Sequence, residues 1–274
     1  MRISPACAAV LTALCALTAR AASPEFFPNA HELFKPLRAD PRELQYALRT
    51  LVPVSRKWLG EAAIGDYLGL VRWPLPWQNA KLQVSGGGGF FGRFDLSGTS
   101  NDMESADFYA NLPLDLRVGK WSSRLMLYHT SSHLGDDYLK KTGLTTAKHS
   151  WDNLKWLLSY EPVDEVRFYG GYNYTFRTLP LGLGRNALQA GVECQTPWMA
   201  RHWQYYWAND FQSWQRIQWN PWFNSQLGVR VQKSPSEARS VSFFLEFGTG
   251  HQPQGQFFLQ QETHWGLGIK FDLS

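Results

Sequence analysis

The stretch Ala106-Asp-Phe-Tyr-Ala-Asn-Leu-Pro-Leu-Asp-Leu-Arg-Val118 alternates between apolar and polar residues. One face carries Ala106, Phe108, Ala110, Leu112, Leu114, Leu116 and Val118, and the other carries Asp107, Tyr109, Asn111, Pro113, Asp115 and Arg117. Successive side chains of a β-strand point to opposite faces, so a period of two predicts a strand with one apolar face.

The same period recurs along the chain, in the segments 166–177, 188–195, 223–232 and 264–272. Alternating segments here run to about ten residues, the length that a tilted strand needs to cross a bilayer. Strands of a soluble β-sandwich, the main alternative, usually have about five or six residues. Strand length therefore favours a membrane barrel over a sandwich.

The connections between these segments alternate in length. Short connections fall at residues 73–80, 119–120, 161–164, 196–199 and 234–238, and longer polar or Gly-rich ones at 97–104, 132–149, 179–185, 212–221 and 250–261. Short periplasmic turns and longer extracellular loops are typical of an outer-membrane barrel. We therefore predict an all-β, antiparallel transmembrane β-barrel.

The number of strands follows from the topology. Eleven strands can be recognised in residues 62–273, and residues 44–52 form a twelfth. Both ends of such a chain lie in the periplasm, so the number must be even. The predicted organisation is a signal peptide at 1–21, an irregular periplasmic lead-in at 22–43 and a barrel of about twelve strands at 44–274.

The first residues have the features of a secretory signal. Arg2 precedes an apolar core at residues 6–17, and Ala19-Arg20-Ala21 provides a site for signal-peptide cleavage. Cys7 and Cys15 would leave with this peptide, so Cys194 would have no partner for an internal disulfide. We expect export to the outer membrane of a Gram-negative bacterium.

Composition narrows the choice of partners. Hydrophobic residues make up 44% of the chain and aromatic residues 15%, and the net charge is only +4. This charge gives no support for nucleic-acid binding. We expect contact with outer-membrane lipids and with the barrel-assembly machinery, although the chain ends Phe271-Asp-Leu-Ser274 and not on an aromatic residue. The oligomeric state is left open.

The inward-facing charges are of both signs. The predicted inward residues include Arg117, Arg124, Arg167, Arg177, Arg230, Lys270, Asp115, Glu193 and Glu246. Opposite charges on one inner surface favour a packed polar lumen, with a narrow polar channel as the alternative.

A second stretch, Leu127-Tyr-His-Thr-Ser-Ser-His-Leu-Gly-Asp-Asp-Tyr138, runs from such a strand into an acidic loop. Residues 119–120 form a periplasmic turn, so the strand that follows ends near the outer leaflet. His129 and Ser131 are in phase with Leu127 and therefore face lipid. The returning strand begins near residue 150, which brings Asp152 close to His129.

A histidine, a serine and an acid on the lipid side could hydrolyse a lipid ester without removing the lipid from the membrane. His129 would act as base and Ser131 as nucleophile, while Asp152 (or Asp136 or Asp137) would orient the imidazole. In the alternative interpretation, His129 and Ser131 are ordinary interfacial residues and the two loop aspartates serve solvation.

A metal site is a further alternative, because His129, His133, Asp136 and Asp137 are all potential ligands. Residues four apart on a straight strand are about 13 Å apart, too far to share one ion. We therefore expect no metal and no cofactor. Ser132, His133, Asp136 and Asp137 are assigned to anchoring the long loop.

Four stretches resemble the uncharacterised domain-of-unknown-function 1207 family of bacterial envelope proteins. They are Phe34-Lys-Pro-Leu-Arg-Ala-Asp-Pro-Arg42, Tyr128-His-Thr-Ser-Ser-His-Leu-Gly-Asp-Asp-Tyr138, Leu188-Gln-Ala-Gly-Val-Glu193 and Gly266-Leu-Gly-Ile-Lys-Phe271. The resemblance covers nearly all of the chain after the predicted signal peptide. It implies an envelope location, and the family has no established activity.

A looser similarity links His129 and Ser131 to the His-x-Ser of outer-membrane phospholipase A and lipid A deacylase barrels. This similarity implies a serine-type lipid esterase or deacylase. The chain departs from both groups in the continuation Ser132-His-Leu-Gly-Asp136 and in the longer spacing to Asp152. We therefore predict an outer-membrane barrel whose activity the sequence leaves open. Hydrolysis of lipid acyl esters at the outer leaflet is the leading hypothesis, and a non-enzymatic structural or small-solute transport barrel is the alternative.

Overall fold

The computed structural model describes residues 23–54, 58–97, 101–145, 148–200, 202–233 and 239–273. The predicted signal peptide at 1–21, with Cys7 and Cys15, lies outside the described residues. Within them, no helix is both long enough and apolar enough to span a membrane.

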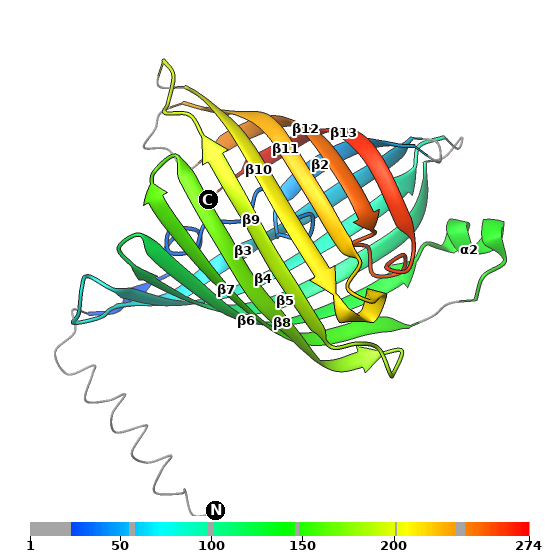
Figure 1. Ribbon diagram of the computed structural model, residues 1–274, viewed down its shortest axis with the longest axis horizontal. Helices are drawn as coiled ribbons and strands as arrows, with labels where there is room; N and C mark the ends of the chain where they lie inside the picture. The colour runs from blue at the N-terminus through cyan, green and yellow to red at the C-terminus, as the bar shows by residue number, and fades with distance from the viewer. Residues whose placement is uncertain are drawn as a thin grey trace, which may run out of the picture.

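The described residues form a closed barrel of twelve antiparallel strands (Figure 1). The strands are β2 (Tyr46–Pro53), β3 (Leu59–Pro74), β4 (Lys81–Asp95), β5 (Asp102–Val118), β6 (Trp121–Leu134), β7 (His149–Val163), β8 (Val166–Leu179), β9 (Asn186–Gln195), β10 (Trp203–Trp214), β11 (Pro221–Gln232), β12 (Ser240–His251) and β13 (Gln261–Asp272). Pairing of β13 with β2 closes the ring. This confirms the predicted fold class.

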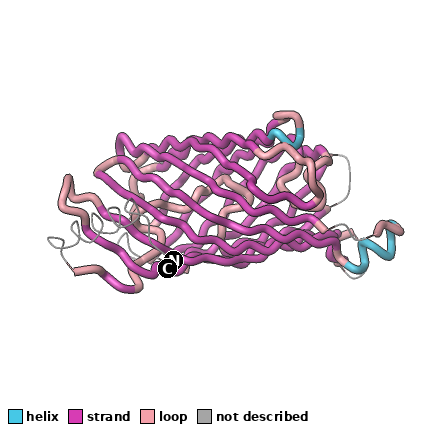
Figure 2. The backbone as a smooth tube through the Cα atoms, turned by 90° about the horizontal axis from the view of Figure 1, so that it is seen from below, coloured by secondary structure: helices cyan, strands magenta, loops and turns pink. Residues whose placement is uncertain are grey.

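The two ends of the barrel differ. Two-residue turns join β5 to β6 and β7 to β8 at the end predicted to be periplasmic. At the other end, the connection after β6 contains helix α2 (Asp136–Thr142), and the connection after β10 contains the short 3₁₀ helix η1 (Gln215–Ile217). Both views show α2 projecting away from the wall (Figures 1 and 2).

The faces of the strands follow the predicted alternation. On β6, Leu125 and Leu127 are exposed on the outer face, whereas Arg124 and Met126 are buried on the inner face. A bilayer favours apolar side chains outside, and every backbone N–H and C=O must find a partner within the sheet. A closed barrel with an apolar exterior satisfies both requirements.

The lead-in before β2 differs from the expectation. A short strand, β1 (Glu25–Phe26), pairs with β3, and the chain then runs into the barrel. We expected residues 22–43 to lie in the periplasm, but Leu33, Phe34 and Leu37 are completely buried and pack within the lumen. The pattern of prolines predicted an irregular segment correctly, but it carried no signal that this segment fills the barrel.

Aromatic and polar contacts hold the lead-in in place. The Phe34 ring lies between two inward-facing guanidinium groups, 4.7 Å from Arg124 and 4.8 Å from Arg167. Asp40 accepts hydrogen bonds from Gln189 at 2.9 Å and Gln212 at 3.1 Å. The lead-in therefore forms a plug that is joined to β6, β8, β9 and β10.

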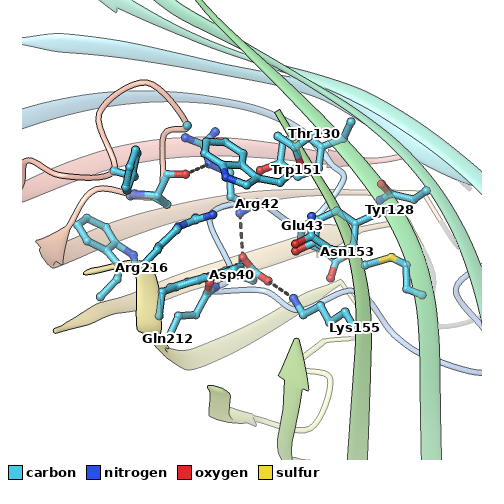
Figure 3. A pocket seen from close by; sticks show the side chains of 18 of the residues that line it. Asp40, Arg42, Glu43, Tyr128, Thr130, Trp151, Asn153, Lys155, Gln212 and Arg216 are labelled. Atoms are coloured by element: carbon cyan, nitrogen blue, oxygen red, sulfur yellow. Dashed lines mark hydrogen bonds and ion pairs between the residues drawn. The ribbon is translucent and has the colours of Figure 1, made fainter. Parts of the chain in front are cut away.

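The interior is packed with paired charges. Arg124 binds the buried Asp115 through two hydrogen bonds of 2.8 and 2.9 Å. A cavity of about 70 Å³ remains in the extracellular half, between Asp40, Arg42 and Arg216 of the plug and wall (Figure 3). That volume has room for about two water molecules. The lumen is therefore a packed polar interior, and a wider cavity of about 520 Å³ opens at the periplasmic mouth.

Removing one partner of the Arg124–Asp115 pair should destabilise the barrel strongly. Arg124→Met leaves a buried carboxylate without its counter-charge, which costs about 3–5 kcal/mol of unfolding free energy. Urea unfolding in micelles, followed by heat-modifiable migration, measures this loss. The double variant Arg124→Met/Asp115→Leu should recover only part of it, because the buried Glu43, 3.7 Å from Arg124, still loses this counter-charge. Equal stability of wild type and Arg124→Met would contradict the pairing.

Removing the plug should open the lumen. Deletion of residues 28–41 takes away the buried apolar side chains and Asp40, leaving the polar wall facing water. In a liposome-swelling assay with small sugars, we expect the deletion variant to be permeable and the wild type to be impermeable. Heat-modifiable migration of the variant shows that the barrel still forms, and permeable wild-type protein would refute the packed lumen.

Candidate active site

The candidate site begins on the outer face of β6. His129, Ser131 and His133 continue the outward row of Leu125 and Leu127 toward the extracellular end of the strand. The His129 side chain is 46% exposed, while its neighbour Thr130 is buried in the lumen. This placement agrees with the predicted lipid-facing position of His129 and Ser131.

Asp152 lies directly opposite His129 in the pairing of β6 with β7. The Oδ1 atom of Asp152 is 2.5 Å from Nδ1 of His129. Side chains directly opposite each other on antiparallel strands have Cβ atoms about 5 Å apart, so the strand register itself creates this contact. His129 and Asp152 are therefore in contact, as predicted. Neither of the loop aspartates, Asp136 and Asp137, is needed to orient the imidazole.

Ser131 has a different partner from the one predicted. Its Oγ atom is 2.9 Å from Nε2 of His133. Because β6 continues to Leu134, His133 is two residues beyond Ser131 on the same outer face. Ser131 thus lies between two imidazoles, with His129 on one side and His133 on the other. The prediction that His133 belongs to the loop is wrong, because the strand is longer than expected.

Ser132 is also a strand residue, and it points into the lumen. Its hydroxyl donates to Asp107, and its backbone oxygen accepts a hydrogen bond of 2.7 Å from Gln256. Gly255 donates its N–H to Asp107 at 3.0 Å. Ser132 therefore helps to anchor the loop between β12 and β13 rather than the loop that follows its own strand.

Asp136 and Asp137 begin α2 and are exposed. Negative side chains in the first turn of a helix interact favourably with its dipole. Asp137 is also 3.4 Å from Lys140 one turn later. Their position indicates a role in stabilising α2.

One residue of this site lies on the opposite face from the one predicted. Arg177 was expected in the lumen, but it points outward with 67% of its side chain exposed. A β-bulge shifts the register, so that Thr175 opposes Asn153 whereas Arg177 opposes Asp152. The Nη1 atom of Arg177 is 3.6 Å from Oδ2 of Asp152. Strict alternation cannot reveal a bulge, which inserts one extra residue into a strand.

The polar side chains interrupt an otherwise apolar outer surface. Phe108 of β5 packs edge-on against His133, with ring centroids 6.1 Å apart. Tyr174 and Phe176 of β8 are exposed beside Arg177. A histidine paired to an acid beside a serine can activate a hydroxyl for acyl transfer. The arrangement is therefore chemically suited to attack on an ester that reaches it from the membrane.

The described residues contain no group of three or more His, Cys, Asp or Glu side chains placed to hold a metal ion. Cys194 is a free thiol on the partly exposed outer face of β9.

Solved outer-membrane proteins share this fold. The Salmonella typhi outer membrane phospholipase, solved as a dimer with bound calcium, has a TM-score of 0.53 and 12% identity, covering 85% of this chain and 93% of that chain. The outer membrane phospholipase A from Escherichia coli has a TM-score of 0.50 and 13% identity, covering 83% and 92%. A KdgM porin has a TM-score of 0.46 and 7% identity, covering 83% and 98%.

At these identities the likeness concerns the fold alone, and the two phospholipase structures support an outer-membrane β-barrel. A search of curated proteins finds no match. Residues 2–273 match the family model described as "Protein of unknown function (DUF1207)", and the chain therefore belongs to this family.

Proposed function

We propose that this barrel hydrolyses acyl esters of lipids in the outer leaflet. The observation that carries the proposal is the hydrogen bond between His129 and Asp152 beside Ser131, on the side of the wall that faces lipid. A soluble hydrolase must extract its lipid from the membrane. Here an acyl ester could reach the serine by lateral diffusion within the leaflet.

The chemistry follows from the two ring nitrogens of His129. If Nδ1 carries the proton and donates it to Asp152, Nε2 is left with a lone pair that can accept a proton. Serine side chains change rotamer on the picosecond to nanosecond scale, so the Ser131 hydroxyl can turn from His133 toward His129. The Asp152 carboxylate keeps the imidazole in this tautomer and orientation.

Catalysis would then proceed in two steps. Ser131 Oγ attacks the acyl carbon while its proton moves to His129 Nε2, which returns that proton to the leaving alcohol as the original ester bond breaks. A water molecule then attacks the acyl-serine ester and gives its proton to His129. The departing Ser131 oxygen takes that proton back, which releases the fatty acid and restores the site.

The role of base could instead fall to His133, because that imidazole is the one in contact with Ser131. Asp152, however, is paired with His129, and an imidazole oriented by an acid is the stronger catalytic arrangement. His129 is therefore the proposed base, and His133 is proposed to hold the resting hydroxyl.

Phospholipase activity belongs to the two structurally similar phospholipases, and it is proposed for this chain only as a hypothesis. The competing function is a non-enzymatic structural or transport barrel. The plug favours hydrolysis over transport, because a solute would have to displace residues 33–44, most of which are buried. We also propose that the chain is exported through a signal peptide at 1–21 and inserted into the outer membrane by the barrel-assembly machinery.

Substitution of the proposed catalytic residues should abolish hydrolysis. We expect Ser131→Ala and His129→Ala to lower kcat about 1000-fold or more, and Asp152→Ala to lower it about 100-fold or more. The assay measures fatty acid released from mixed micelles of phospholipid or lipid A. Ser225→Ala is the matched control, since Ser225 is a serine of β11 that accepts a hydrogen bond from the exposed Trp207. Full activity of Ser131→Ala would refute the proposal.

Substitution of His133 distinguishes the two possible bases. If His129 is the base, His133→Ala should retain activity within about tenfold of wild type, because Ser131 loses only its resting partner. If His133 is the base, the loss should equal that of Ser131→Ala. His133→Ala and Ser131→Ala must both keep the heat-modifiable migration of wild type, which shows that the barrel, including β6, still forms.

A further inference from the structure

The outward position of Arg177 depends on one extra residue in β8. On that strand Tyr172 and Tyr174 point outward and Asn173 and Thr175 inward. Phe176 is then outward as expected, but Arg177 is outward as well, and the following residue returns to the lumen. Strict alternation counted along the strand from Arg167 would instead place Arg177 in the lumen.

An arginine on the lipid-facing side is costly unless it lies close to the interface or has a partner. Arg177 lies near the extracellular end of β8 and has such a partner, because its Nη1 atom is 3.6 Å from Oδ2 of Asp152. The other carboxylate oxygen, Oδ1, is the one that contacts His129. Asp152 therefore bridges the imidazole and the guanidinium, one on each oxygen.

A carboxylate held at one oxygen can still rotate, whereas a carboxylate held at both cannot. The guanidinium group is always charged in proteins, so it also provides a permanent counter-charge for the ionised acid. Bulges commonly redirect a side chain next to an active site.

We propose that Arg177 is a positioning residue, which holds Oδ2 of Asp152 so that Oδ1 stays directed at Nδ1 of His129. The effect on turnover rests on the proposed function, but the effect on the imidazole does not. Arg177 touches neither the ester nor the serine in this role, and it acts only through Asp152.

The direct test observes the His129 ring by ¹⁵N NMR in micelles, in a Ser131→Ala background that carries out no turnover. With Arg177 present, we expect the Nδ1–H tautomer to dominate at a pH where the ring is neutral. Arg177→Gln should lower its fraction, and Arg177→Lys should lie between, since lysine keeps the charge but lacks the planar fork. Arg185→Gln, which removes an exposed arginine 3.5 Å from the Tyr174 hydroxyl, is the matched control and should change nothing.

The kinetic test uses two substrates. For a neutral water-dispersed ester, Arg177→Gln should lower kcat about fivefold with an unchanged KM, as expected for an exposed ion pair. Arg177→Lys should recover part of this loss. A rise in KM for phospholipid alone, with normal kcat, would instead identify a headgroup contact and overturn the positioning role.

Deletion of Phe176 provides a second variant that keeps Arg177 itself. Removing the extra residue restores alternation with Arg177 still outward and opposite Asp152, so this variant should keep the tautomer fraction seen before the deletion. An unchanged tautomer in Arg177→Gln would overturn the inference, and so would a folded Phe176-deletion variant whose tautomer fraction falls to that of Arg177→Gln. If wild-type protein hydrolyses no ester, the proposed function fails, and the tautomer measurement still decides whether Arg177 orients the pair.

Discussion

The structure depends on one constraint: every backbone hydrogen-bonding group within the bilayer needs a partner from the chain itself. Closure of the sheet between β2 and β13 meets this requirement for the strands. Closure also creates an interior. The polar side chains that point into it include charged groups, and buried charged groups need hydrogen-bond or ion-pair partners. The lead-in supplies several of them, since Asp40 binds Gln189 and Gln212 and the Phe34 ring packs against two guanidinium groups. The plug therefore provides hydrogen-bond and cation–π partners for the inward-facing side chains of the strands.

The same alternation separates two roles on neighbouring residues of β6. Ser131 faces outward between two imidazoles, and Ser132 faces inward and binds Asp107 and the loop after β12. The site is thus built on a strand whose inner face is held by lumen contacts. A serine supported in this way keeps its position relative to the partner strand, which is what acyl transfer requires of a nucleophile and its base.

Much of the architecture could be predicted from the chain, because period-two patterns and loop lengths depend on local sequence. The proximity of His129 and Asp152 was also predictable, since a strand and its returning neighbour form one hairpin. The position of Arg177 was not, because a bulge changes the phase of a strand without changing its composition. The partner of Ser131 was missed because β6 extends to Leu134, and helix or strand ends are the least certain part of such predictions.

The sequence by itself determined an all-β membrane barrel, the outward placement of His129 and Ser131 and the pairing of His129 with Asp152. Each of these depends on contacts between residues close along the chain or on a simple repeat. Only the tertiary structure decided that residues 33–44 fill the lumen, that Ser132 holds a loop more than 100 residues away, and that Arg177 faces lipid beside Asp152. The physical reason is that these features arise when the sheet closes, and closure brings together segments whose separation in the chain no local pattern records.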